Sequence, residues 1–180
     1  MGSQYMSLHL ADPELLKSRL RGDFPDLVET LYKSAKPPAE QLRPAFELMA
    51  RGTFVFLPKG REHPDGYVYC RAFEYLLETV GRRVWNIEFY PDESEDALWS
   101  LAYGRCEASW LDLPATETGI AATAYRSRDT CRSLLGSIDH ALRSNSFNPR
   151  YSPKSSLEEC KQALDEAFTS RLGLFTIFQG

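Results

Sequence analysis

The chain has 180 residues, of which 43% are hydrophobic and 26% charged, and its formal net charge is −4. This length suits one domain that buries a core without the help of a metal or disulfide. The 21 Lys and Arg residues are scattered along the chain, whereas nucleic-acid binding needs a clustered basic surface. We therefore expect one globular domain over residues 1–180 with no nucleic-acid partner, in which residues 1–6 can be a disordered or cloning-derived start.

The sequence predicts a reduced, cytoplasmic protein without a metal or cofactor. No apolar run approaches the ~20 residues of a membrane-spanning helix, and the first residues lack the charge-then-apolar order of a signal peptide. The cysteines form no CxxC pair, so their spacing indicates neither a zinc site nor a redox dithiol. We expect Cys70, Cys131 and Cys160 in the core, because each lies on an apolar helical stripe. The expected assembly is a monomer or a small homo-oligomer.

The first third of the chain predicts one strand and three helices. Residues 5–10 alternate in the period of a strand, and Asp12 is the expected cap of a helix that ends at residue 22. Two more helices are expected over residues 23–35 and 37–52. The two faces of the strand carry Met6, Leu8 and Leu10 on one side and Tyr5, Ser7 and His9 on the other.

The middle of the chain predicts a short buried strand over residues 53–58 and, after a turn, a helix over residues 67–80 that Gly81 ends. One wide apolar stripe runs along this helix at intervals of three and four residues. The stripe carries Tyr67, Cys70, Phe73, Leu77 and Val80, and we place Arg71, Glu74 and Glu78 on the opposite side.

Residues 84–90 alternate again and predict a second strand, after which Asp92 and Glu95 form the capping pair of a further helix. One face of this strand is expected in the core, and the other either meets water or lines a site. The core face carries Trp85, Ile87 and Phe89, and the other face carries Asn86, Glu88 and Tyr90.

The last part of the chain predicts a strand over residues 105–110 and two helices over residues 127–145 and 155–172. Residues 115–125 are rich in small side chains and stay unassigned. The second helix is expected to begin at a capping box that consists of Ser156 and Glu159.

Residues 174–178 are apolar on both faces, which is typical of a strand inside a sheet. The predicted fold is α+β, with helices packed on a small mixed sheet that includes the N- and C-terminal strands. We hypothesise that these two terminal strands lie side by side.

The segment YCRAFEYLLETVGRRVWNIEFYP, residues 69–91, resembles a family of small, mostly actinobacterial proteins of unknown function. The family pattern is a helix with an alanine and leucines that ends in Gly, followed by Asn-x-x-Phe-x-Pro. It falls here on Ala72, Leu76, Leu77, Gly81, Asn86, Phe89 and Pro91. The terminal SRLGLFTIF is similar to the end of the same family, and the two ends of the chain are also similar to the YfbM-like bacterial proteins. Neither resemblance implies a catalytic residue.

The first functional hypothesis is a non-enzymatic, immunity-type or accessory protein. The sequence contains no metal-ligand, phosphate-loop or nucleophile-elbow motif. Tyr and Trp residues gather between residues 67 and 110, where they either fill the core or form a binding surface. This hypothesis has a protein partner bound through an acidic, aromatic-lined surface.

The alternative is a small enzyme that acts on a polar small molecule through a carboxylate acid or base. A carboxyl group partly buried beside aromatic side chains can exchange a proton near neutral pH. The catalytic candidates are Glu88, Asp92 and His63, and the candidates for substrate binding are Asn86, Tyr90 and Tyr67.

Overall fold

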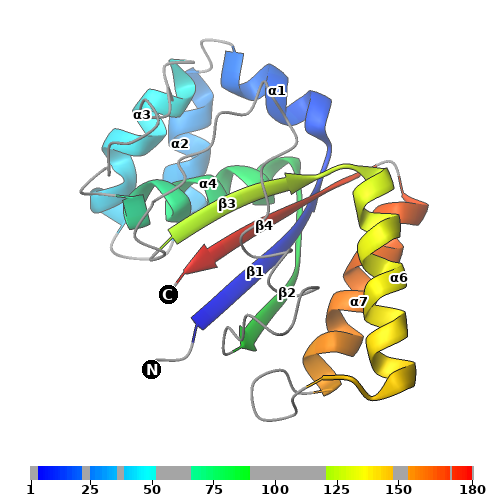
Figure 1. The fold of residues 1–180 in the computed structure, drawn as a ribbon. Coiled ribbons are helices and arrows are strands. Elements are labelled where there is room, and N and C mark those ends of the chain that lie inside the picture. Colours follow the sequence, from blue (N-terminus) through cyan, green and yellow to red (C-terminus); the bar gives the residue numbers. More distant parts are fainter. Residues whose placement is uncertain are drawn as a thin grey trace, which may run out of the picture.

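The computed structural model describes residues 4–21, 25–35, 39–51, 66–89, 121–147, 154–170 and 172–179. Within these ranges a four-stranded sheet lies between two layers of helices (Figure 1). The fold class is α+β, as predicted. The described strands are β1 (Gln4–Ala11), β2 (Gly81–Phe89), β3 (Ala121–Arg126) and β4 (Gly173–Gln179).

The order of the strands is β2-β1-β4-β3. The two terminal strands, β1 and β4, are hydrogen-bonded neighbours, which confirms their predicted adjacency. Every pair in this sheet is antiparallel, so the prediction of a mixed sheet is wrong. The direction of a strand in the sheet depends on the path of the helical connections before it. The hydrophobic pattern of the strand itself does not indicate this direction.

The helices form one layer on each face of the sheet (Figure 1). The first layer consists of α1 (Pro13–Arg21), α2 (Pro25–Ser34), the 3₁₀ helix η1 (Ala39–Leu42), α3 (Arg43–Ala50) and α4 (Gly66–Val80). The second consists of α6 (Arg128–Ser144) and α7 (Lys154–Thr169). None of the helices in the described part is long and apolar enough to cross a membrane.

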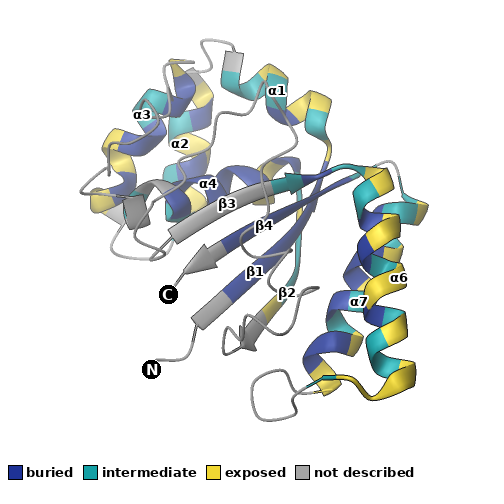
Figure 2. Ribbon diagram, in the orientation of Figure 1, coloured by how far each residue is buried: buried dark blue, intermediate teal, exposed yellow. Residues whose placement is uncertain are grey.

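Strand β1 is buried on both faces (Figure 2). Its predicted apolar face packs against α6 and α7 together with Leu174 of β4. Its other face points toward α4, where Phe175 and Ile177 of β4 continue the core. The predicted alternation of β1 is therefore confirmed, and both of its faces lie under helices.

The predicted start of α1 is confirmed, but that of α7 is wrong. The backbone N–H groups of Glu14 and Leu15 donate to Asp12 Oδ1 at 2.9 and 3.1 Å, which is the hydrogen bonding of an N-cap. Helix α7 already begins at Lys154, so Ser156 lies inside its first turn and is buried rather than capping. Helix α4 ends directly before Gly81, as predicted.

Strand β3 was not predicted, because its sequence AATAYR offers small side chains in place of an apolar alternation. Its position comes from pairing with β4, in which Tyr125 lies opposite Phe175. The strands predicted over residues 53–58 and 105–110 and the helix predicted from Asp92 lie outside the described residues.

Gly81 is expected to be essential for the junction of α4 and β2. A Cβ atom there would press on the backbone carbonyl of Leu10 and sit 2.6 Å from the Cα of Ala11. We expect Gly81→Ala to lower the free energy of unfolding by about 1–3 kcal/mol through overpacking, measured by urea denaturation. The control is Gly136→Ala in α6, where nothing lies within 4 Å of the added Cβ; helix propensity should raise stability by about 0.5–1 kcal/mol. Equal effects of the two variants would contradict this packing.

Candidate functional site

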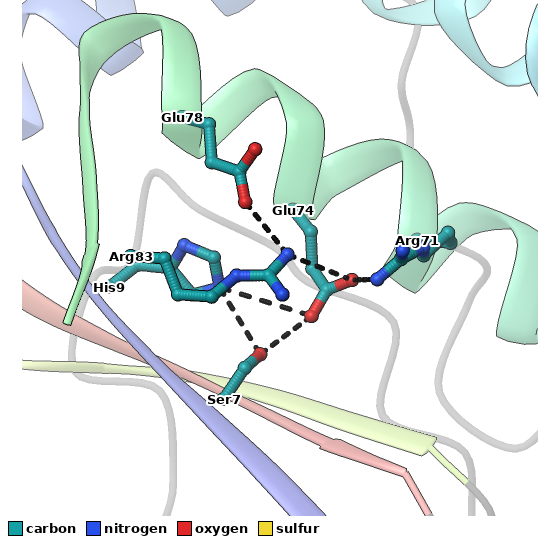
Figure 3. A network of polar contacts seen from close by, with 6 residues as sticks. All are labelled: Ser7, His9, Arg71, Glu74, Glu78 and Arg83. Carbon is teal, nitrogen blue, oxygen red and sulfur yellow. Dashed lines mark hydrogen bonds and ion pairs between the residues drawn. The ribbon is translucent and has the colours of Figure 1, made fainter. Parts of the chain in front are cut away.

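Six polar side chains from β1, α4 and β2 meet between α4 and the sheet (Figure 3). They form what we call the buried polar cluster: Ser7, His9, Arg71, Glu74, Glu78 and Arg83. The period of two places Ser7 and His9 on the same face of β1, and helix α4 supplies the acids opposite them.

The centre of the cluster is a group of three almost inaccessible side chains. Ser7 Oγ donates a hydrogen bond of 2.7 Å to Glu74 Oε1, and His9 Nε2 lies 3.1 Å from the same serine oxygen. The imidazole and the carboxylate are 3.9 Å apart, measured from Nε2 to Oε1. Ser7, His9 and Glu74 are 6%, 0% and 3% exposed, so this group is shielded from bulk solvent.

Two arginines balance the charge of the cluster. Arg71 pairs with Glu74 Oε2 from one turn earlier on α4, and its guanidinium also lies over the ring of Tyr75, 5.2 Å from the centroid. Arg83 on β2 reaches Glu74 Oε2 at 3.8 Å and Glu78 Oε1 at 2.7 Å. The two guanidiniums thus neutralise two carboxylates, and the pairs join α4 to the second strand of the sheet.

These contacts decide the ionisation of Glu74. Burial alone raises its pKa, but the neighbouring His9, the Ser7 hydroxyl and the two arginine charges more than offset this and hold the pKa at about 2. The group is therefore a carboxylate at neutral pH. A general acid or base works best with a pKa near the working pH, so Glu74 is suited to charge pairing and not to proton transfer.

The arrangement differs from a catalytic Ser-His-acid triad. In a triad the histidine lies between the serine and the acid and takes the serine proton. Here Ser7 lies between His9 and Glu74 and donates its proton directly to the carboxylate. The serine is a bridge within a stabilising cluster.

Sequence reasoning placed Glu74 on the polar side of α4, and this was wrong. At about 100° per residue, Glu74 points only about 40° away from Cys70, so it belongs at the margin of the apolar stripe and faces the sheet. A signal for the site was present in the alternation of β1, where Ser7 and His9 share one face of a strand with a fully apolar opposite face.

The structure describes the predicted site residues only in part. Asn86 is exposed and lies opposite Ser7 in the register of β1 and β2, and the backbone of Glu88 lies opposite Tyr5. The side chains of Glu88 and Tyr67 lie outside the described part, as do His63, Tyr90 and Asp92 as whole residues. The proposed roles of these residues stay predictions.

Two of the clustered aromatic residues are packed in the interior. Tyr75 is 6% exposed and meets Phe46 edge-on, with 6.3 Å between ring centroids. Trp85 is half-buried and packs against the core that α6 and α7 form. For these two residues the core interpretation holds.

No protein-family model matches the chain, and no curated protein sequence or solved structure matches it. The site has to be interpreted from its own geometry. Over the described ranges, no group of three His, Cys, Asp or Glu side chains is arranged to hold a metal ion.

Replacing Glu74 with Gln should destabilise the protein and remove part of its acid sensitivity. At about pH 7 the variant leaves the guanidiniums of Arg71 and Arg83, which are 34% and 27% exposed, without this buried anion, which should cost about 1–3 kcal/mol. Because the pKa of Glu74 falls from its ordinary 4.5 to about 2 on folding, its contribution is complete above about pH 5 and is lost as the pH falls toward about 2. Urea unfolding across this range should show the wild-type and variant stabilities converging.

The control for this experiment is Glu78→Gln, because Glu78 is 35% exposed and pairs with Arg83 near the surface. Its loss should cost at most about 1 kcal/mol. A pH dependence of Glu74→Gln that parallels the wild type from neutral to acid pH would contradict the lowered pKa.

The three described thiols should resist alkylation in the folded protein. Burial, followed by the charge of Glu74, raises the pKa of Cys70 to about 12, and burial raises the pKa of Cys160. Cys131 is fully buried beside the carbonyl oxygen of Arg126. Since the thiolate is the reactive form, iodoacetamide at neutral pH should leave all three peptides unmodified until urea is added. Mass spectrometry that finds rapid native labelling of any of them would refute this packing.

Proposed function

We propose that the chain is a non-enzymatic interaction protein, of immunity or accessory type, that binds a basic protein partner through an acidic, aromatic-lined surface. The observation that carries the proposal is the state of the buried polar cluster. Its ionisable groups pair with one another, and the pKa of Glu74 at about 2 makes that carboxylate a fixed charge. A fixed buried charge supports a structural scaffold better than it supports an enzyme with an acid or base at this place.

The proposed surface begins on β2 and continues into the segment that follows it. Asn86 on this strand is exposed. Between Val84 and Gly104 the sequence has five acids and neither Lys, Arg nor His. Those acids are Glu88, Asp92, Glu93, Glu95 and Asp96.

Charge of one sign concentrated beside aromatic side chains favours a protein partner of the opposite sign. Complementary charge increases the rate of association and selects among partners, while Tyr and Trp supply the contacts that hold a complex together. The segment contains Tyr90, Trp99 and Tyr103 beside its acids. A basic partner is therefore the class of ligand that this surface fits.

The experiment neutralises four acids of the segment in one variant, Asp92→Asn, Glu93→Gln, Glu95→Gln and Asp96→Asn. Tagged wild-type protein should retain one basic protein from a lysate of its own cells at low salt and release it at high salt. With that protein purified, calorimetry should give an affinity at least about 10-fold weaker for the variant, as expected for lost charge complementarity.

The matched control makes the same change of charge on helices α1, α2 and α7. It carries Glu14→Gln, Glu29→Gln, Glu158→Gln and Asp165→Asn, all at exposed positions. Its affinity should stay within a factor of about 3 of the wild type, because distant surface charges are screened. The proposal fails if no protein is retained, or if both variants weaken binding equally.

A further inference from the structure

Three buried side-chain nitrogens among the described residues have no hydrogen-bond partner: His9 Nδ1, Arg83 Nε and Trp85 Nε1. Native proteins pair nearly all buried polar groups, so each exception needs a physical explanation. Two of the three atoms belong to the buried polar cluster, and they come from residues that lie directly opposite each other on β1 and β2. The third, on Trp85, belongs to the opposite face of the sheet, where Trp85 packs against the core of α6 and α7.

His9 and Arg83 are brought together by an irregularity in the strand pair. The register shifts between Leu8 and His9, so that Leu8 pairs with Trp85 and His9 pairs with Arg83. A bulge of this kind bends the strand and redirects the side chains beside it. Figure 3 shows the side chain of Arg83 crossing the imidazole of His9 in that view.

Both side chains reach the same carboxylate with their outer nitrogens. His9 Nε2 lies 3.9 Å from Glu74 Oε1, and a terminal nitrogen of Arg83 lies 3.8 Å from Glu74 Oε2. The unpartnered atoms come earlier in each side chain, since Nδ1 is bonded next to the imidazole attachment point and Nε precedes the guanidinium carbon. Along each side chain they are therefore closer to the backbone than the nitrogens that reach Glu74.

The hydrogen bonds of the cluster determine which of these atoms donates. Glu74 is ionised and can only accept, so Ser7 must donate its single proton to it. The oxygen of Ser7 then accepts from His9, which requires the imidazole proton to be on Nε2. In the neutral ring Nδ1 is consequently an acceptor, whereas the Nε–H of Arg83 is always a donor.

We propose that a water molecule is bound between His9 Nδ1 and Arg83 Nε, accepting from the arginine and donating to the imidazole. The group at this position must both accept and donate. A carboxylate accepts only and would leave Nδ1 unpaired, and a metal cation would be repelled by the guanidinium. A hydroxyl group satisfies both atoms, and water is the smallest molecule that carries one, which suits a position beside the fully buried His9.

This water adds to the buried polar cluster a connection between β1 and β2 at the bulge. It fixes the Nε2–H form of His9, because the hydrogen bond at one ring nitrogen sets the protonation of the other. It also links β1 to β2 through side chains at the place where the bulge disrupts their backbone pairing.

NMR of protein labelled with ¹⁵N-histidine tests the proposal. The correlation between ring protons and ring nitrogens at neutral pH should show Nε2 protonated and Nδ1 unprotonated in His9. Magnetisation transfer should also connect the ring proton beside Nδ1 with a long-lived water. A protonated Nδ1, or no such water in the wild type, overturns the proposal.

The informative variant is Arg83→Lys, which keeps the positive charge and removes the Nε–H donor. The water signal at His9 should disappear or shorten to the lifetime of surface water, while the matched control Arg82→Lys should retain it. Arg82 is the adjacent residue and pairs with Glu166 of α7 on the other face. Persistence of the signal in folded Arg83→Lys protein would also overturn the proposal, and if that variant fails to fold the wild-type spectra decide alone.

Discussion

The structure depends on one constraint, which is that β1 has a layer of helices on both of its faces. Its polar residues Ser7 and His9 are shielded from bulk solvent, and a buried polar group is costly unless it finds a hydrogen-bond partner. Glu74 on α4 supplies that partner. A buried carboxylate needs opposite charge in turn, and Arg71 and Arg83 provide it.

These requirements for partners favour one position of α4 on the sheet. Its apolar residues, such as Phe73 and Leu77, lie in the core, and the hydrophobic effect that buries them is non-directional. The contacts of Glu74 are directional, because a shift of α4 by one turn would take the carboxylate away from Ser7 and from Arg83. Breaking a buried ion pair costs several kcal/mol, about 3–5 in measured cases. The polar cluster thus adds positional specificity to the hydrophobic contacts of this helix.

Much of the fold could be predicted from the sequence, because many of its elements leave local, periodic patterns. The alternation of β1, the cap at Asp12 and the apolar stripes of α4, α6 and α7 are local patterns with a fixed period, and they appear where expected. Strand direction and the position of β3 beside β4 depend on pairing between distant segments, which no local pattern records. The site was missed for a related reason, because Glu74 looks like a solvated residue until the sheet is placed under α4. The exposed Asn86 agrees with a solvated row on β2.

The buried polar cluster also anchors β2, the strand on which the proposed binding surface begins. Strand β2 is held on one face by Arg83, which pairs with Glu78 of α4 at 2.7 Å. It is held on the other face by Arg82, which pairs with Glu166 of α7. The exposed Asn86 follows three residues after Arg83, on a strand that both helix layers fix in place. Because binding costs less free energy when one partner is already ordered, a strand anchored in this way is a favourable start for an acidic surface that must meet a partner.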